Sequence, residues 1–392
     1  MWRKIIEYQE KPGEARVKVA GPKQQTLRRL DSRALSTALV GWYARARRDL
    51  PWRHSSEPYP VWVSEIMLQQ TQVERVKDFF SRFMERFPTV DSLAAAAEHE
   101  VLRFWEGLGY YRRARQLHAA AQQIVAEYQG EFPRSTIGLR SLPGIGRYTA
   151  GAIASIAMNL PEPIVEANSR RVLARLAGYQ KRLDRPGDDE PMWTLAKSLV
   201  PKQHPGRFNQ ALMDLGAMVC TPDRPLCGRC PLARFCRAKQ QGSVDRIPLK
   251  AQRRAVVQVR EVAIVARRGN RVLVERRTAG EWWAGLWDFP RALLPQRDPL
   301  KGSAVALASA VLKGLKCRKP EHLATLKHSV THHRVTLEVV QCQVTEAGPR
   351  TIGRRWVRLA ELPTMAMASP ARRIARIQAL HEPIETILSL RK

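Results

Sequence analysis

The pattern of apolar and polar residues divides the chain into two parts of different texture. From Ala34 to about Ala177 apolar residues recur at helical spacing, and this spacing continues to a group of cysteines that begins at Cys220. Glycines and prolines stand at the joints, as expected where helices end. The pattern predicts helices over residues 36–46, 61–87, 93–106, 114–128, 146–158, 193–200 and 209–219.

A charged stretch over residues 243–257 predicts a linker, and the pattern then changes to short runs rich in β-branched residues. These runs predict strands over residues 256–265, 271–275, 336–344 and 355–358, with helices over 304–315 and 370–380. The length of 392 residues is enough for more than one domain. We therefore expect a mobile basic arm (1–33), a mainly α domain (34–242), the linker (243–257) and an α+β domain (258–385).

The charge of the chain points to a polyanionic partner. Lys and Arg number 66 against 36 Asp and Glu, a formal net charge of +30, and such an excess attracts nucleic acid. A highly charged surface without a partner, or binding to a membrane surface, would give the same excess. The even spread of basic residues, without an amphipathic anchor, favours nucleic acid.

The sequence gives no sign of export or of a membrane span. No apolar run is long enough to cross a bilayer, and residues 1–7 begin no secretory signal. We therefore expect an intracellular protein of the cytoplasm or nucleoid.

Four of the six cysteines lie close together, with six, two and five residues between successive members. They are Cys220, Cys227, Cys230 and Cys236. Clustered thiols in a long intracellular chain are typical of a metal centre rather than of a disulfide scaffold. Four thiolates fit zinc or an iron–sulfur cluster, but zinc ribbons usually have two Cys-x2-Cys pairs and this group has one.

The segment Leu-Pro-Gly-Ile-Gly-Arg-Tyr-Thr-Ala-Gly over residues 142–151 lies between two helical stretches. Gly144 and Gly146 flank one apolar residue and permit a tight turn. The next helix begins at this turn, and its positive end suits a phosphate. An ordinary glycine-rich helix junction would have the same pattern.

Residues 58–73 predict a helix entered through prolines, with Glu65 on an apolar face. Val61, Trp62 and Leu68 stand at positions i−4, i−3 and i+3 from Glu65. A carboxyl in such surroundings has a raised pKa and can donate a proton near neutral pH. A glutamate that faces solvent beside a tryptophan is the alternative, and this helix alone does not decide between the two.

These motifs resemble those of one protein family. The cysteine spacing and the segment 142–151 resemble the iron–sulfur loop and the hairpin of the helix-hairpin-helix DNA glycosylases. Glu-Ile-Met-Leu-Gln-Gln-Thr-Gln-Val (65–73) resembles the catalytic helix of the A/G-specific adenine glycosylases, the MutY family. The resemblance covers about residues 36–382. It implies a mainly α helix-hairpin-helix glycosylase domain with a 4Fe-4S cluster on the four cysteines, plus a C-terminal α+β Nudix-like domain.

The resemblance also implies roles for individual residues. Glu65 is expected to protonate N7 of adenine and then to activate water. Tyr148 stands where relatives that also nick the strand carry a lysine, so we expect hydrolysis without strand cleavage. Gln70 and Tyr110 match residues that wedge into the base stack when the base is flipped out. Residues around the adenine pocket are matched by Arg48, Trp52, Arg53, Leu68 and Gln210.

The sequence departs from the family at the second carboxylate, an aspartate in an Asp-Gly-Asn segment that stabilises the sugar cation. Here Glu166, Ala167 and Asn168 occupy the segment, so the charge sits on a side chain one methylene longer. The longer side chain could cost much of the rate unless the backbone retreats. We expect Glu166 to be catalytic, Asn168 to fix the segment and Tyr148 to face the same sugar. A carboxylate that offsets a helix dipole is the structural alternative.

The C-terminal part resembles a Nudix-type fold from residue 262 to residue 290. Residues 300–316, where Nudix hydrolases hold Mg²⁺, contain no Asp or Glu, so we expect no pyrophosphohydrolase activity. In the MutY family this domain inspects 8-oxoguanine through a Phe-Ser-His loop, and Val330, Thr331 and His332 match it. Thr331 and His332 are therefore expected to read the lesion. A threonine-rich strand with incidental histidines is the alternative.

The predicted reaction is hydrolysis of the N-glycosidic bond of adenine paired with 8-oxoguanine or guanine in duplex DNA, by a monomer. One alternative is a related glycosylase that removes mismatched thymine or oxidised pyrimidines. Another is a lesion-binding protein in which Glu166 has disabled the chemistry. A zinc-binding transcription-type module is a third.

Overall fold

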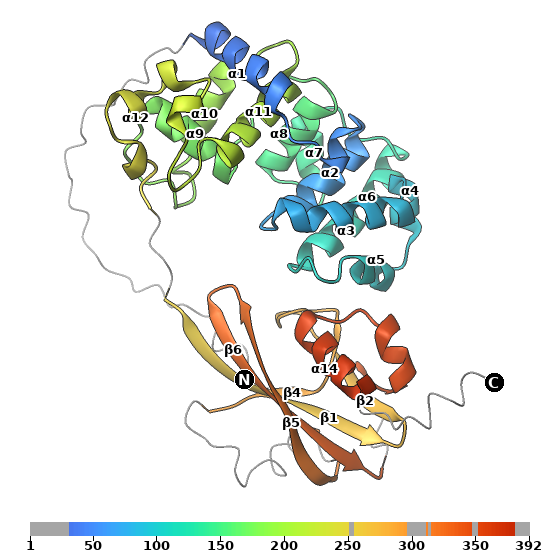
Figure 1. Cartoon of the computed structure of the whole chain (residues 1–392). Helices are drawn as coiled ribbons and strands as arrows, with labels where there is room; N and C mark the ends of the chain where they lie inside the picture. Colours follow the sequence, from blue (N-terminus) through green and yellow to red (C-terminus); the bar gives the residue numbers. More distant parts are fainter. Residues whose placement is uncertain (1–30, 251–254, 296–310, 313–314, 347–351, 381–392) are drawn as a thin grey trace, which may run out of the picture. The chain divides into compact units, whose positions relative to one another are not determined.

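The computed structural model describes residues 31–250, 255–295, 311–312, 315–346 and 352–380. They belong to two compact units (Figure 1). The first unit comprises Met1–Ala95 and Gln116–Gln252, and the second comprises Ala96–Arg115 and Arg253–Lys392. Within the described ranges, no helix combines the length and the apolar character needed to cross a lipid bilayer.

The first unit is built from helices joined by short turns. Its helices are α1 (Ser32–Ala46), α2 (Pro58–Leu68), α3 (Val73–Arg86), α4 (Val90–Ala95), α6 (Arg112–Tyr128), α7 (Thr136–Ser141), α8 (Arg147–Ile156), α9 (Ala167–Ala177), α10 (Glu190–Leu199), α11 (Pro205–Met218) and α12 (Arg237–Gln240), with 3₁₀ turns at Pro51–Arg53, Cys227–Arg229, Ala233–Phe235 and Val244–Arg246. The first turn of α6 and all of α5 (Glu98–Phe104) belong to the second unit.

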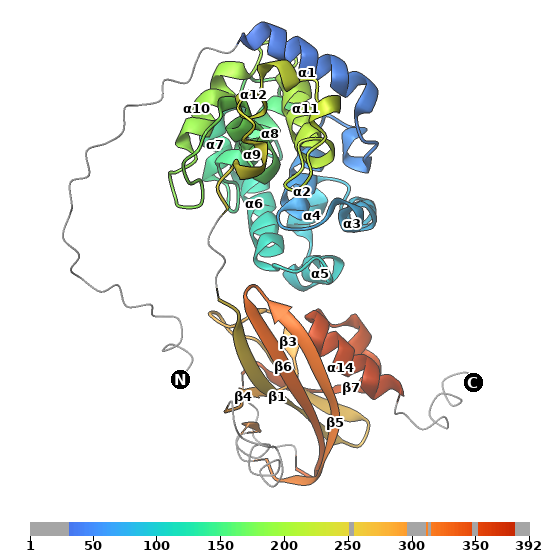
Figure 2. The same cartoon turned by 60° about the vertical axis from the view of Figure 1, so that its left-hand side comes forward.

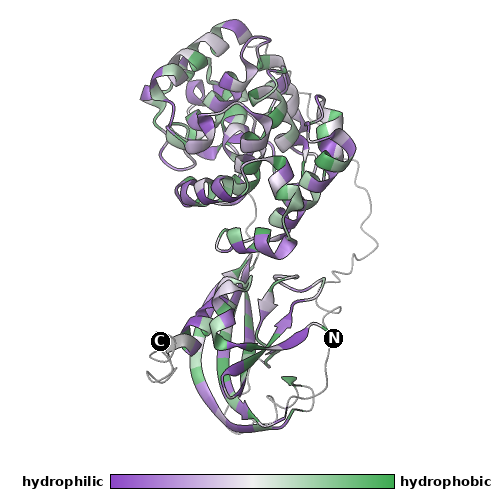
Figure 3. Cartoon of the chain, turned by 90° about the vertical axis from the view of Figure 1, so that its right-hand side faces the viewer, coloured by the Kyte–Doolittle hydropathy of each residue, from purple (hydrophilic) through white to green (hydrophobic). Residues whose placement is uncertain are grey.

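An apolar cluster holds α1, α9, α10 and α11 together. Leu39, Leu173, Trp193, Phe208 and Leu212 are buried in it, at least one from each of these helices. Hydrophobic and hydrophilic residues alternate along the helices (Figure 3), as amphipathic packing requires. Burial of each large apolar side chain contributes about 1.5–3 kcal/mol. This cluster fixes α9 and α11, which carry several candidate site residues.

The start of the first helix differs from the prediction. α1 begins at Ser32, and the side chain of Asp31 caps it by accepting a hydrogen bond of 3.0 Å from the Ala34 N–H. The predicted arm therefore extends too far, because residues 31–33 belong to the helix or its cap. The rest of the arm lies outside the described residues.

Two long predicted helices are wrong, because each is interrupted. The helix expected over residues 61–87 is α2 and α3, separated by a turn in which Gln70 has φ of 56°. The helix expected over 93–106 is likewise divided into α4 and α5. Apolar spacing continues across the first break, since Val76 and Phe80 of α3 are also buried. The pattern therefore shows the buried faces but not the turn between them.

Among its described residues, the second unit contains a seven-stranded sheet with the order β3-β2-β1-β6-β5, in which β4 also pairs with β1 and β7 with β2. Its elements are β1 (Val257–Arg268), β2 (Arg271–Arg276), β3 (Trp287–Asp288), β4 (Arg291–Leu293), β5 (Cys317–Val330), β6 (His333–Val344), β7 (Arg354–Arg358), a 3₁₀ helix (Leu359–Thr364) and α14 (Ser369–Leu380). β1 and β6 run parallel and the other paired strands antiparallel. Figure 2 shows α14 lying along the sheet.

Both faces of the sheet carry an apolar core. One core includes Ala263, Val339 and Ile374 of α14, and the other includes Val262, Val340 and Leu312. The predicted strands near 256–265, 271–275, 336–344 and 355–358 are present, as is the helix near 370–380. β5 was not predicted, because Cys317 and Leu326 are its only fully buried residues. Most of the helix expected over 304–315, and most of the segment 300–316, lies outside the described residues.

The expected linker is partly structured. It contains the 3₁₀ turn Val244–Arg246, and its last residue, Val257, already belongs to β1. Residues 251–254 lie outside the described residues.

Candidate active site

Glu65 is a buried carboxylic acid. α2 begins with Pro58 at its first position, where the missing N–H costs no hydrogen bond. All residues from Val61 to Met67 are buried, and only 5% of Glu65 is exposed. Burial disfavours the charged carboxylate and raises the pKa of Glu65 to about 7. The alternative of a solvent-facing glutamate is therefore wrong.

Tyr148 is the direct partner of this acid. Its phenol donates a hydrogen bond of 2.5 Å to Oε2 of Glu65 and lies 3.3 Å from Sδ of Met213. Burial, and then the negative charges of Glu65 and Glu166, hold the pKa of Tyr148 well above its usual value. The phenol therefore stays protonated and acts as a donor.

The charges around Glu65 act in opposite directions on its pKa. Burial has the largest effect. Of the smaller effects, the hydrogen bond from Tyr148 lowers the pKa of Glu65, the charge of Glu166 raises it, and the charge of Arg53 lowers it. The raised pKa of about 7 shows that burial outweighs the stabilising contacts. Glu65 can thus hold a proton at neutral pH and release it to a basic atom.

Glu65 opens onto a cavity of about 50 Å³ in the first unit. The predicted pocket residues meet there: its lining includes Arg48, Trp52, Arg53, Leu68 and Gln210. The fold brings these positions together from α2, α11, the Pro51–Arg53 turn and the loop before that turn, which carries Arg48. Arg48, Arg53, Ile156 and Gln210 also line a neighbouring cavity of about 570 Å³. A cavity of about 710 Å³, beside Pro58 and Phe132, contains none of the predicted site residues.

Asp214 holds two of these arginines and was not predicted. Its buried carboxylate accepts hydrogen bonds from Arg48 Nε at 2.8 Å and from Arg53 Nη1 and Nη2 at 2.7 and 2.9 Å. Asp214 stands four residues after Gln210 on α11, and hence on the same helix face. That spacing was the one signal in the sequence that could have identified it.

Glu166 is the N-cap of α9. Its Oε2 accepts a hydrogen bond of 2.7 Å from the Asn168 N–H, and its Oε1 accepts one of 2.7 Å from the Ser169 N–H. The Ser169 hydroxyl completes a capping box with the Glu166 backbone N–H at 2.8 Å. Glu166 is thus a carboxylate at a helix N-terminus, as the structural alternative expected. The negative charge of Glu166 contributes to the raised pKa of Glu65.

Asn168 fixes the start of α9 rather than contacting Glu65. Its Oδ1 accepts a hydrogen bond of 2.9 Å from Arg171 Nη2. Gly216 of α11 packs against it so closely that a Cβ at residue 216 would lie 2.7 Å from the Asn168 Cβ. A glycine is therefore required for α9 and α11 to approach at this point.

The glycine segment forms a helical hairpin, α7 followed by α8. Gly144 has φ of 77°, and a Cβ there would lie 2.8 Å from the Gln116 Cβ, so a larger residue is strained and crowded. Gly146 is the N-cap of α8, with open space around its Cα. The exposed N-terminus of α8 is thus accessible to an anion.

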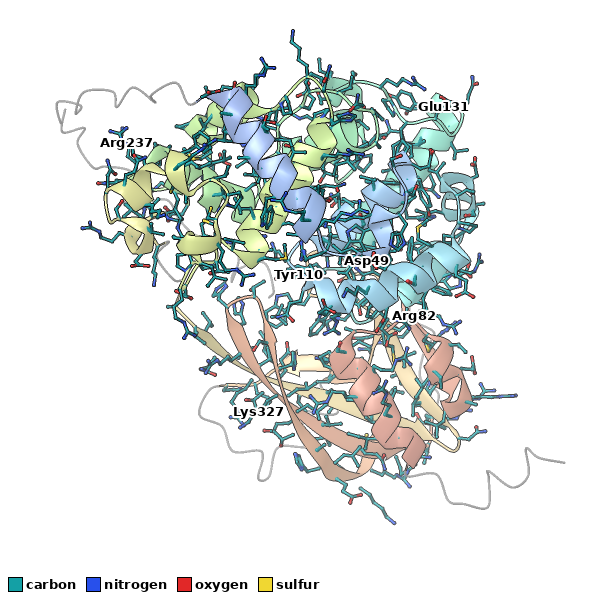
Figure 4. All side chains as sticks on the ribbon, turned by 45° about the horizontal axis from the view of Figure 1, so that its top comes forward. Asp49, Arg82, Tyr110, Glu131, Arg237 and Lys327 are labelled. Atoms are coloured by element: carbon teal, nitrogen blue, oxygen red, sulfur yellow. The ribbon has the colours of Figure 1, made fainter. Side chains whose placement is uncertain are left out.

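Gln70 and Tyr110 are both exposed residues in unusual backbone conformations. Gln70 has φ of 56° in the turn after α2, and Tyr110 has φ of 49° with 48% of its surface exposed. Figure 4 shows Tyr110 among the labelled side chains. Positive φ in residues other than glycine is rare and often occurs at functional positions. Tyr110 belongs to the second unit and Gln70 to the first.

The four clustered cysteines line one small cavity. All four are free and half-buried, and burial raises the pKa of Cys230 to about 11, with contributions from the other three thiols. Among the described residues, no three His, Cys, Asp or Glu side chains are grouped closely enough to hold a single metal ion.

Buried arginines of α9 fix this cysteine loop. Arg175 donates hydrogen bonds to Cys220 Sγ at 3.3 Å and to the Thr221 carbonyl at 2.7 Å. Arg171 donates one of 2.7 Å to the Cys220 carbonyl. Arg237, labelled in Figure 4, begins α12 directly after the last cysteine.

In the second unit, Thr331 and His332 form the turn between β5 and β6. Thr331 is exposed and has φ of 53°, an outlier for a β-branched residue. The rings of Trp282 and His333 lie 5.2 Å apart beside this turn, and those of His332 and His333 lie 4.1 Å apart.

Comparison with known proteins gives the family. Residues 63–198 match the HhH-GPD superfamily of base excision DNA repair proteins, and residues 261–376 match the NUDIX domain. The human adenine DNA glycosylase is 34% identical over 89% of this chain and 75% of its own length. The chain belongs to the adenine DNA glycosylase family. It is therefore a base excision repair enzyme that acts on adenine in DNA.

This member of the adenine DNA glycosylase family is also similar to other known proteins. The adenine DNA glycosylase of Buchnera aphidicola subsp. Schizaphis graminum is 36% identical over 65% of this chain and 74% of its own length. A solved structure of a thermostable thymine-DNA glycosylase covers 54% of this chain and 97% of its own, with 27% identity and a TM-score of 0.49. The expected fold class, a helix-hairpin-helix glycosylase domain followed by a Nudix-like domain, is confirmed.

Proposed function

We propose that the chain hydrolyses the N-glycosidic bond of adenine mispaired with 8-oxoguanine or guanine in duplex DNA, without cutting the strand. The main support for the proposal is that Glu65 and the predicted adenine-pocket residues line one cavity. The pKa of Glu65 there is raised to about 7. A protonated acid beside a flipped-out purine is what this reaction needs.

Glu65 acts first as the acid. It transfers its proton to N7 of adenine, so that the base leaves as a neutral molecule while the bond to the sugar breaks. The resulting carboxylate then accepts a proton from the water that attacks the sugar. The Tyr148 hydrogen bond, which stabilises this carboxylate, holds it in place between the two steps.

Glu166 supplies the negative charge that stabilises the cationic sugar. Its two oxygens are fixed by the N–H groups of Asn168 and Ser169, and a carboxylate held in this way needs little reorganisation as positive charge develops. Capping and catalysis are compatible, because each carboxylate oxygen has a second lone pair. Asn168 acts by fixing this segment.

Tyr148 explains why the strand is not cut. Strand cleavage by related enzymes needs an amine that attacks the sugar, and a phenol hydrogen-bonded to Glu65 offers no such nucleophile. We expect base release to leave an intact abasic strand.

The remaining predicted residues are assigned to DNA. The turn containing Gly144 and Gly146 presents the N-terminus of α8 to a backbone phosphate. Gln70 and Tyr110 enter the base stack at the extruded adenine. Thr331 and His332, beside the Trp282 and His333 rings, read the 8-oxoguanine left in the opposite strand.

The four cysteines would hold a 4Fe-4S cluster, which stabilises the fold of the loop from Cys220 to Cys236. When bound, it supplies the positive centre that the four thiolates require. The arginines in and beside this loop are then positioned for phosphates.

Single-turnover assays on defined duplexes test the proposed function. Wild-type protein should release adenine opposite 8-oxoguanine and guanine, and should not release thymine from a thymine:guanine pair. Glu65→Gln should lower adenine release by about 10²–10⁴-fold, the usual contribution of a general acid. Glu131→Gln, which changes an exposed glutamate, is the matched control and should retain the wild-type rate.

The alternatives give different outcomes in the same assay. Thymine release would indicate a mismatch thymine glycosylase. Tight binding of the 8-oxoguanine:adenine duplex without release would indicate a lesion-binding protein. Full adenine release by Glu65→Gln would contradict the assignment of the acid.

A further inference from the structure

The two arginines of the catalytic cavity share one buried anchor. The side chain of Asp214 is completely buried (0% exposed), whereas 27% of the Arg48 side chain and 10% of the Arg53 side chain are exposed. Arg48 reaches Asp214 through Nε at 2.8 Å and Nη2 at 2.6 Å, and Arg53 forms a bidentate pair at 2.7 and 2.9 Å. Bidentate arginine–carboxylate pairs fix the geometry of both groups.

The surrounding contacts make this cluster rigid. The backbone N–H of Arg48 also donates to Asp214 Oδ2 at 3.3 Å, and Arg53 Nη1 donates to the Arg48 carbonyl at 3.2 Å. Tyr43 donates a hydrogen bond of 2.5 Å to Oε1 of Gln210, the cavity residue one turn before Asp214. The loop that carries Arg48 and Arg53 is thus attached to α11 through one carboxylate.

Asp214 must be charged to perform this role, and its surroundings favour the charge. Burial alone would raise its pKa, but the hydrogen bonds and positive charges of Arg53 and Arg48 more than offset burial and hold the pKa below its usual value. The two positive charges in the wall of the cavity that contains Glu65 are therefore paired with one buried negative charge.

The charge of Asp214 has a consequence for the acid. The groups that act on Glu65 are Tyr148 of α8, Glu166 at the start of α9 and Arg53, and the positive charge of Arg53 favours ionised Glu65. An uncompensated Arg53 would thus draw the proton off the acid at lower pH. A carboxylate paired with Arg53 weakens this effect, since opposite charges in contact cancel much of each other's field.

We propose that Asp214 is a positioning residue of the catalytic cavity: it holds Arg48 and Arg53 in the wall and limits the effect of their charge on Glu65. The proposal rests on the proposed function, because it takes Glu65 as the proton donor. Asp214 itself does not line the cavity and acts through the two arginines.

Three variants should shift the pH dependence of single-turnover adenine release in defined directions. Activity needs protonated Glu65, so the rate falls as pH rises through the pKa of Glu65. Asp214→Asn should lower the rate about 10-fold or more at pH 7 and move this descending limb to lower pH. Arg53→Gln should move the limb to higher pH. In the double variant Arg53→Gln/Asp214→Asn, which changes the net charge by zero, the limb should return toward the wild-type position.

Two further variants separate positioning from folding. Asp214→Glu keeps the charge and should retain the wild-type limb with a smaller loss of rate. Asp184→Asn removes another Asp–Arg pair, the exposed one with Arg182. It should change neither the rate nor the pH at which the rate falls. Thermal unfolding of each variant reports its folded state. If Asp214→Asn is unfolded, the proposal is tested with Asp214→Glu and Arg53→Gln.

The proposal is overturned if Asp214→Asn is folded and keeps the wild-type limb, or if Arg53→Gln leaves the limb in place. A uniform loss of rate at every pH would show a structural role alone. Glu65→Gln, assayed in parallel, distinguishes a failure of the role of Asp214 from a failure of the proposed function. If it is inactive while Asp214→Asn is unchanged, only the role of Asp214 fails; if it is fully active, the proposed function fails.

Discussion

The phenol of Tyr148 donates a hydrogen bond of 2.5 Å to the carboxylate of Glu65, joining α8 of the hairpin to α2. The two residues are 83 positions apart in the sequence. The contact connects the element expected to bind the DNA backbone with the expected proton donor. It also lowers the pKa that burial has raised, and thereby sets the pH range in which the acid can work.

Removal of this hydrogen bond should move the pH dependence upward. Tyr148→Phe deletes the donor that favours ionised Glu65, so the pKa of Glu65 should rise above about 7. The descending limb of single-turnover adenine release should then lie at higher pH than in the wild type. Tyr59→Phe is the matched control, because Tyr59 is also buried but donates to the Phe87 carbonyl. A limb that moves to lower pH in Tyr148→Phe would contradict this account.

The buried acid should also cost stability at neutral pH. Unfolded Glu65 loses its proton near pH 4.5, whereas the folded protein keeps it to about pH 7. The proton therefore favours the folded state fully below pH 4.5, and this advantage is lost as pH rises to 7. Glu65→Gln, which cannot ionise, should be more stable than wild type by about 3 kcal/mol at pH 8 and equal to it near pH 4. Chemical denaturation at several pH values measures the difference, with Glu131→Gln expected to show no such trend.

Substitutions of Glu166 can distinguish its role as a helix cap from its role as a negative charge beside the sugar. Glu166→Asp keeps both, because aspartate is a favoured N-cap residue, and should leave adenine release measurable. Glu166→Gln keeps an acceptor for the cap but loses the charge beside the sugar, and should lower the rate at least 10-fold. Glu166→Ala should in addition lower the free energy of unfolding by about 1 kcal/mol.

A second acidic N-cap provides the control for this series. Asp31→Ala removes the cap of α1, in which Asp31 accepts from the Ala34 N–H, and should cost about as much stability as Glu166→Ala. It should leave the rate unchanged. If Glu166→Gln released adenine as fast as the wild type, Glu166 would be a helix cap alone.

The sequence predicted the residues of the cavity better than the interactions that hold them. Glu65 could be recognised because its apolar neighbours at helical spacing and its surrounding motif agree. Asp214 was missed, because only its spacing of four residues from Gln210 pointed to it, and that spacing looks the same whether the carboxylate contacts two arginines or water. Its partners lie 161 and 166 residues away in the sequence.

The same limit applies to the fold. The break at Gln70 was missed because the apolar residues on either side keep helical spacing, and β5 was missed because an edge strand with few buried residues has no clear alternation. In both cases tertiary packing, rather than local preference, decides the structure. The hairpin at Gly144 was predicted correctly since its positive φ is a local requirement.

The cysteine loop gives a prediction that does not depend on catalysis. Purified protein should contain about four iron ions per chain and absorb visible light. Cys236→Ser should lose iron and visible absorption together, because the loop from Cys220 to Cys236 would lack one of its four ligands. Cys317→Ser is the matched control, since Cys317 lies in an apolar core of the second unit. It should retain the iron. Zinc in place of iron in the wild type would contradict the prediction, as would a Cys236→Ser protein with full iron content.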